Sequence, residues 1–252
     1  MLGTLFQQLY NTADAVVVGR FVGTRALAAV GGSTGQMVNL IVGFFVGLSS
    51  GATVIIARYY GAKNKKDLND TLHTAAALSV AGGILITIAG ILFTPSMLKI
   101  MKTPADVMAD SATYLRIYFG GIIFVFIYNV GSAILRAVGD STRPLYFLIV
   151  CCFINIFLDV LLVVGFNMGV AGAAIATVVS QAVSAVLVIW ALLKSTDMYC
   201  LHPKEIRFHK FLLVSIITIG LPAGIQSVMY NLANMIIQTS LNDLGTSTMA
   251  AY

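Results

Sequence analysis

Residues 145–176 read LYFLIVCCFINIFLDVLLVVGFNMGVAGAAIA, in which two apolar runs are separated by the short break GFNMG. About 20 mostly apolar residues suffice to cross roughly 30 Å of hydrocarbon as an α-helix. The stretch therefore predicts two membrane-spanning helices joined by a tight turn. A single carboxylate, Asp159, lies inside the first run. Because a charge at the bilayer centre costs about 2.5–3.5 kcal/mol on insertion scales, such a residue usually faces a cavity and has a function.

The composition of the whole chain also indicates a membrane environment. Hydrophobic residues make up 58% of the 252 residues and charged residues only 10%, whereas a soluble domain carries about 25% charge. The mean hydropathy is +0.92. The apolar runs are continuous, without an alternation of period two, which favours an all-α polytopic membrane bundle over a β-barrel. The candidate helices cover residues 1–19, 34–57, 71–94, 112–135, 145–165, 171–193 and 211–241.

The basic residues are distributed unequally between the two sides of this bundle. Ten of the 15 lysines and arginines lie in the loops after the second, fourth and sixth candidate helices, and five lie on the other side. The positive-inside rule places the richer side in the cytoplasm, together with the N-terminus. We therefore expect a multi-pass protein of the plasma membrane, in contact with lipid. The net charge of +5 follows from this topology and does not call for a nucleic-acid partner.

The two ends of the chain resemble one another. YNTADAVVVGRFVGTRALAA, from Tyr10, aligns with YNLANMIIQTSLNDLGTSTMAA, from Tyr230, if the second copy has two inserted residues. Six helices separate the copies, so both would cross in the same direction, as in transporters built from parallel repeats. We expect a fragment of a two-lobed protein that lacks most of its C-terminal lobe. It would comprise a six-helix lobe at 1–194, a cytoplasmic linker at 195–210 and the first helix of a truncated second lobe at 211–252.

Asp14 and Asp159 are the acids that this topology places at depth, whereas the other eight lie in loops or at helix ends. Both lie within outward-running helices, about six residues, or roughly 9 Å, below the predicted outer face. No lysine or arginine shares that level, so the pair is predicted to bind protons or a cation.

Further polar side chains fall on the same helix faces at spacings of three, four and seven residues. Each could simply hold two helices together, for about 0.6 kcal/mol, but three helices with polar groups at one depth favour a site. The candidates for lining a substrate cavity are Gln7, Tyr10, Asn11, Ser180 and Gln181, with Asn155 and Thr177 nearer the acids.

Several separated motifs resemble those of the multidrug and toxic compound extrusion (MATE) family. They are ADAVVVGRFVG at 13–23, LRAVGDSTRPL at 135–145, NIFLDVLLVVGFNMGVAGAAIAT at 155–177 and IGLPAGIQ at 219–226. Members of that family are about twice this length, with two six-helix lobes around a central cleft. The resemblance implies that the residues matching the family's cation or proton coupling site are Asp14, Tyr114, Asn155, Asp159 and Thr177. The second copy of the repeat has Asn234 at the place of Asp14, so coupling is expected in one lobe only.

The resemblance also implies a function. The expected activity is antiport, in which small organic cations or drugs are exported in exchange for H⁺ or Na⁺ by alternating access, without an enzymatic reaction or a cofactor. Na⁺ prefers oxygen ligands, which Asp14, Asn155, Asp159 and Thr177 could supply. The sequence does not choose between the two ions.

Two other functions were weighed. A lipid-linked saccharide flippase of the same superfamily would need basic residues in its cavity to bind an anionic pyrophosphate, and the deep charges here are acidic. A seven-helix receptor or retinal protein is disfavoured because the N-terminus is predicted inside and the last helix has no lysine for a Schiff base. The histidines have no metal-ligand spacing, and the three cysteines are expected to be reduced.

Overall fold

The computed structural model describes residues 2–101, 103–195 and 197–243, with side chains for residues 12–32, 34–101, 103–195 and 197–233. This part of the chain is helical and contains no β-strand. The long helices are α1 (Leu2–Phe21), α3 (Ser33–Gly61), α4 (Lys65–Ile100), α5 (Met108–Ala137), α6 (Thr142–Asp159), α7 (Gly169–Leu193) and α8 (Lys210–Asp243). The short elements are α2 (Thr24–Gly31), the π-helix η1 (Val160–Gly165) and the 3₁₀-helix η2 (Pro203–Glu205).

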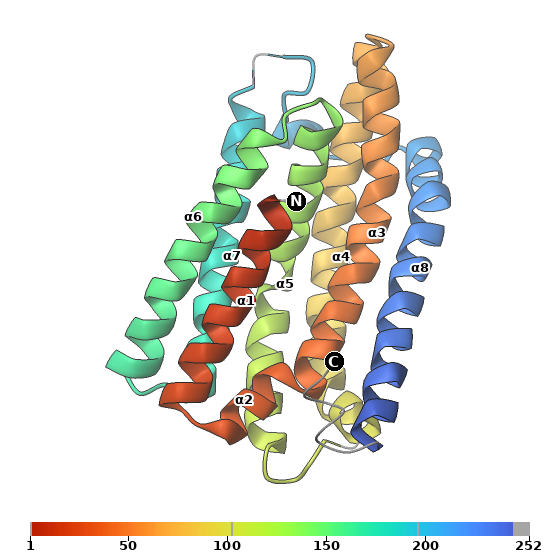
Figure 1. Ribbon diagram of the computed structural model, residues 1–252. Helices are drawn as coiled ribbons and strands as arrows, with labels where there is room; N and C mark the ends of the chain where they lie inside the picture. Colours follow the sequence, from red (N-terminus) through yellow and green to blue (C-terminus); the bar gives the residue numbers. More distant parts are fainter. Residues whose placement is uncertain (1, 102, 196, 244–252) are drawn as a thin grey trace.

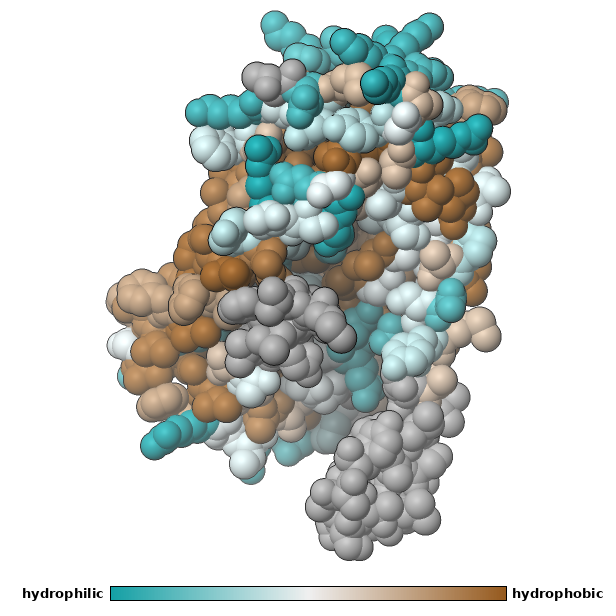
Figure 2. Space-filling model, turned by 45° about the horizontal axis from the view of Figure 1, so that its top comes forward, coloured by the Kyte–Doolittle hydropathy of each residue, from teal (hydrophilic) through white to brown (hydrophobic). Residues whose placement is uncertain are grey.

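The long helices stand side by side in one bundle (Figure 1). The α3–α4 turn, the α5–α6 turn and segment 194–209 lie at one end, at the top of Figure 1, which we call the basic end. Figure 2 shows hydrophilic residues gathered at this end and hydrophobic ones below it. Helices α1 and α8 run in the same direction, away from the basic end, as expected for the two copies of a parallel repeat.

The expected all-α architecture is confirmed, and each of the seven candidate helices corresponds to a long helix. Six helices of the described part are long and apolar enough to cross a membrane. The sequence analysis missed α2, where we had expected a loop between residues 19 and 34. Gly23, at φ 113°, ends α1 and allows the chain to turn. The buried Ala26, Ala29 and Val30 then hold the short helix against the bundle.

The core lies mainly around α5. Near the middle of the bundle, Phe119, Ile122 and Phe126 are almost completely buried, and the ring of Phe126 stacks on Phe45 of α3 with 3.7 Å between centroids. Large apolar side chains on the outside of the bundle, such as Leu92 and Phe157, remain exposed. In a membrane protein these outward side chains meet lipid, which is as apolar as they are.

Helices α3 and α8 approach one another along a line of small residues. An added Cβ at Gly47 of α3 would lie 2.5 Å from the Cα of Gly224 on α8, and one at Gly51 would lie 2.7 Å from the backbone nitrogen of Gly220. Such small-residue spacing allows close backbone contact between membrane helices. We call this contact the glycine seam. Through it the last described helix packs directly on the first six-helix unit, and the division at residues 194 and 211 stays a prediction.

Candidate functional site

The two acids predicted at depth meet in the structure. Asp14 lies in the second half of α1, and Asp159 is the last residue of α6 before the π-helix η1. Their carboxyl groups lie side by side near the end of the bundle opposite the basic end. Asp159 is fully buried and Asp14 is 7% exposed. Neither forms an ion pair with a basic group in the described residues.

Three further side chains surround the acids. The phenol of Tyr114, on α5, lies beside Thr177 of α7 and close to both carboxyls. Asn155 is one turn before Asp159 on α6 and is fully buried. Helices α1, α5, α6 and α7 thus bring together the five residues that the resemblance had selected, which we call the acid cluster: Asp14, Tyr114, Asn155, Asp159 and Thr177.

The acid cluster has unused hydrogen-bonding capacity. Within the part of the chain that the structure describes, Oδ1 of Asp14, both oxygens of Asp159 and both polar atoms of Asn155 are buried without a hydrogen-bond partner. Two carboxylates offer only acceptors to one another, so a proton or a cation is needed between them. Carboxylate and amide oxygens suit a hard cation such as Na⁺, and carboxyl groups can equally hold a proton. The residues present therefore fit either ion.

The backbone after Asp159 departs from the regular α-helix. Residues 160–165 form the π-helix η1, and the N–H of Phe166 donates to the carbonyl oxygen of Leu161 at 3.0 Å. The turn that follows uses positive φ angles at Asn167 and Gly169. π-Helical segments occur frequently at functional sites because they change the direction of neighbouring side chains. The sequence showed the turn residues but gave no signal for the π-helix.

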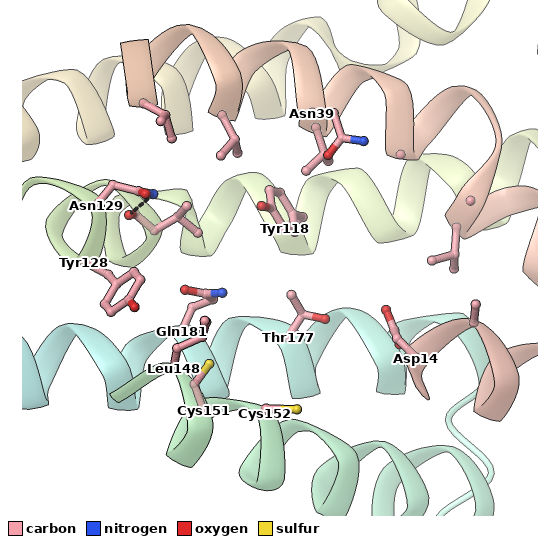
Figure 3. A pocket seen from close by; sticks show the side chains of 18 of the residues that line it. Asp14, Asn39, Tyr118, Tyr128, Asn129, Leu148, Cys151, Cys152, Thr177 and Gln181 are labelled. Carbon is pink, nitrogen blue, oxygen red and sulfur yellow. Dashed lines mark hydrogen bonds between the residues drawn. The ribbon is translucent and has the colours of Figure 1, made fainter. Parts of the chain in front are cut away.

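A cavity of about 750 Å³ opens beside the acid cluster. It extends from α2, where Leu27 and Val30 line it, past Asp14 to Arg136 and Ser141 near the basic end. In Figure 3, Asp14 lies on one side of the view, Tyr128 and Asn129 lie on the other, and Thr177 lies between them. Asp14, Tyr114 and Thr177 line it, whereas Asn155 and Asp159 lie behind them and are not among its lining residues. Asp14 is the acidic residue among those that line the described cavity, and it lies toward the end opposite the basic end.

The predicted cavity residues divide into three groups. Gln181 lines the cavity, and its buried Oε1 has no partner among the described residues. Ser180 is fully buried, donates its hydroxyl to the carbonyl oxygen of Thr177 at 2.8 Å, and is not among the lining residues. Gln7, Tyr10 and Asn11 lie in the first half of α1, where side chains are outside the described residues.

The sequence analysis missed one wall of the cavity. Helix α5 contributes lining residues at intervals of four and seven, which is the spacing of one helix face. They are Tyr114, Tyr118, Val125, Asn129 and Arg136, and Tyr128 of the same helix lines the cavity beside Asn129. Asn129 donates its side-chain N–H to the carbonyl oxygen of Val125 at 2.8 Å, which leaves its amide oxygen available to a ligand. The regular spacing could have revealed this face, but only Tyr114 lies at the depth of the acids.

No cluster of three or more histidines, cysteines or acids that could bind a metal ion is present among the described residues. The three cysteines are free thiols, with Cys151 and Cys152 buried next to the cavity.

Comparisons with known proteins agree on one family. The MatE family model matches residues 1–161. A probable multidrug resistance protein of Bacillus subtilis (strain 168), YoeA, is 32% identical over 260 residues, covering all of this chain and 56% of that protein. The multidrug export protein MepA of Staphylococcus aureus (strain MRSA252) is 23% identical over 252 residues, again with full coverage of this chain and 56% of the relative.

Solved structures extend the likeness to three dimensions. The outward-facing conformation of a multidrug resistance MATE family transporter of the MOP superfamily is 28% identical, with a TM-score of 0.87 over 95% of this chain and 53% of that one. Its inward-facing counterpart has a TM-score of 0.83 over 90% and 51%. The chain spans about half the length of these relatives. Because the family model covers well over half of the sequence, the chain belongs to the MatE family, whose members are membrane transporters and not enzymes.

Proposed function

We propose that this chain forms the N-terminal lobe and the first helix of the second lobe of a multidrug antiporter of the plasma membrane. The transporter exports small organic cations in exchange for H⁺ or Na⁺ by alternating access, and the N-terminus faces the cytoplasm. The multidrug resistance and export proteins to which the chain is similar support the drug-export class. The inward-facing and outward-facing structures that it resembles support alternating access.

One observation carries the coupling part of the proposal. Asp14 and Asp159 lie side by side, buried, without an ion pair in the described residues, and Asp14 lines the cavity. Leaving two carboxylates buried without compensation is costly, so the pair gains free energy when it takes up a proton or a cation. Asp14 lines the cavity itself, so an ion bound there competes with an organic cation for the same negative charge.

The acidic residue in the cavity also argues against the flippase alternative. An anionic pyrophosphate cargo would require basic groups along the cavity. Arg136, exposed near the basic end, is the basic residue among those that line the described cavity, and Asp14 lies nearer the opposite end. We therefore retain cationic cargo as the proposal.

Ion binding can be tested on the 252-residue chain in detergent. We expect either Na⁺ at constant pH to raise the unfolding temperature or a drop in pH to be accompanied by proton uptake. Each effect should disappear in Asp14→Asn and in Asp159→Asn. The matched control is Asp110→Asn, because Asp110 is exposed on α5 and lies outside the acid cluster. If all three variants respond as the unmodified protein does, the acid cluster does not bind the ion.

Export is tested on the full-length transporter reconstituted in vesicles. Ethidium efflux is measured across a pH series and, separately, across a sodium series at fixed pH. We expect efflux to follow one of the two ions, and Asp159→Asn to abolish that dependence. Normal, ion-dependent efflux in Asp159→Asn would contradict the proposed coupling role and would leave this acid a contact between helices.

A further inference from the structure

The linker between α7 and α8 is docked on the basic end of α4. Tyr199 and Leu201 are buried there in an apolar cluster with Leu72 of α4. The following residues are exposed but form hydrogen bonds with one face of α4. Asn69 donates its side-chain N–H to Glu205 Oε2 at 2.9 Å, and Thr74 Oγ1 accepts the backbone N–H of His209 at 3.2 Å. Segment 199–209, which we call the docked linker, is therefore an ordered connection.

His73 of α4 lies at the centre of this contact. The side chain is 1% exposed, and its Nδ1 lies 2.7 Å from the carbonyl oxygen of Asn69. Its Nε2 accepts the backbone N–H of His202 at 2.9 Å. A carbonyl oxygen can only accept and an N–H can only donate, so Nδ1 must carry the proton and Nε2 must offer a lone pair. The contact therefore requires the neutral imidazole.

Protonation would remove this bond. An imidazolium has an N–H at both nitrogens, so Nε2–H would face the N–H of His202. Charged groups of the linker also face His73. The ring of His202 stacks on it at 6.3 Å between centroids and repels it when both rings are charged, whereas the carboxylate of Glu205 attracts a charged His73 and opposes release, so release depends on the bond lost at Nε2.

The remaining charges of the contact lie around Asp70, one turn before His73 on α4. Asp70 is 3.3 Å from His209 Nε2 and 3.8 Å from Arg207. No ion pair joins His73 to another helix in the described residues.

We propose that His73 and the docked linker form an acid-sensitive latch between the six-helix lobe and α8. Neutral His73 holds the linker on α4, and protonation from the basic end releases it and frees the start of α8. The linker joins the two parts of the chain that must move relative to one another in an alternating-access cycle. The latch would therefore respond to the pH at the basic end, separately from the acid cluster at the opposite end. This inference rests on the alternating access proposed above, but not on which ion or drug is transported.

The size of the effect follows from linkage. If the ring can bind a proton only when the linker is free, docking weakens as pH falls, because acid favours the protonated, undocked state. Release that takes up one proton changes the docking equilibrium by at most about tenfold per pH unit, and docking is compared between about pH 7.5 and pH 5.5. Glu205 titrates below this window, since the hydrogen bond from Asn69 lowers its pKa.

Hydrogen exchange of the His202 amide tests the latch on the 252-residue chain. Exchange is expressed as protection relative to the unstructured rate at the same pH, which removes the direct effect of pH on chemistry. We expect protection in the unmodified chain to fall as the pH is lowered from about 7.5 to 5.5, by at most about tenfold per pH unit. His73→Gln should keep constant protection, because a glutamine amide can both donate to Asn69 and accept from His202 without titrating.

His209→Gln is the matched control, since it removes a second histidine of the same contact and leaves His73 in place. It should retain the pH dependence of the unmodified chain. The proposal is overturned if protection in His73→Gln falls with pH as it does in the unmodified chain. It is also overturned if protection in His209→Gln does not change with pH. Either result assigns the pH dependence to a group other than His73. A flat profile in the unmodified chain would overturn it as well, and this measurement needs no change at residue 73.

Discussion

Replacement of Gly47 by alanine tests how tightly α8 is held against the six-helix lobe. The added Cβ would lie 2.5 Å from the Cα and the nitrogen of Gly224, and 2.7 Å from the carbonyl carbon of Ala223. Carbon atoms in favourable contact are about 3.5–4.0 Å apart. The obstructing atoms belong to the backbone of α8, so no side chain can rotate away. The two helices must separate by roughly 1 Å, and overpacking of this kind costs about 1–3 kcal/mol.

The steric cost of the added Cβ is partly offset by the higher helix propensity of alanine, and a control variant separates the two effects. Alanine is a better helix former than glycine by roughly 0.5–1 kcal/mol, which offsets part of the steric cost at Gly47. Gly120 of α5 is also inside a spanning helix, but an added Cβ there meets nothing within 4 Å. Gly120→Ala therefore reports the gain in helix propensity alone. The difference in unfolding free energy between the two variants isolates the steric cost, at about 1–3 kcal/mol.

Unfolding in mixed micelles with increasing SDS provides the assay. Trp190 is the only tryptophan of the chain and gives a fluorescence signal without labelling. We expect Gly47→Ala to unfold at a lower SDS fraction than Gly120→Ala. If the two variants unfold at the same fraction, α3 and α8 do not touch at the glycine seam, and the reasoning from close backbone approach is refuted.

Two further predictions concern buried amides and exposed acids. Asn155→Leu should raise the unfolding free energy of the ion-free chain by about 1–3 kcal/mol, because it removes a buried amide without partners. Na⁺ binding should weaken because one oxygen ligand is lost, and reduced stability of the ion-free chain would contradict this prediction. Glu205, whose pKa is lowered by the hydrogen bond from Asn69, should stabilise linker docking above its ordinary pKa and lose this effect as pH falls through the lowered value. In Asn69→Ala, an NMR titration should give a higher pKa for Glu205 than in the unmodified chain, and an unchanged pKa would exclude this hydrogen bond.

The position of each group along the membrane normal could be predicted from the sequence. A helix rises 1.5 Å per residue, and the bilayer limits where charges can lie. Counting residues therefore placed Asp14 and Asp159 at one level, and the structure places them side by side. The tight turn after Asp159 could also be predicted, because Asn and Gly accept the positive φ angles that it contains.

The direction in which each helix face points was decided by the tertiary structure. The α5 wall with Tyr118 and Asn129, the glycine seam at Gly47 and the contact between His73 and the linker all depend on which neighbour a helix packs against. The sequence had given His73 no role. By itself, then, the sequence determined the membrane solvent, the long helices and the depth of the acids, since these follow from local hydrophobicity and helical rise. Only the tertiary structure decided the cavity wall, the π-helix and the docking of the linker, because they arise from contacts between segments distant in the chain.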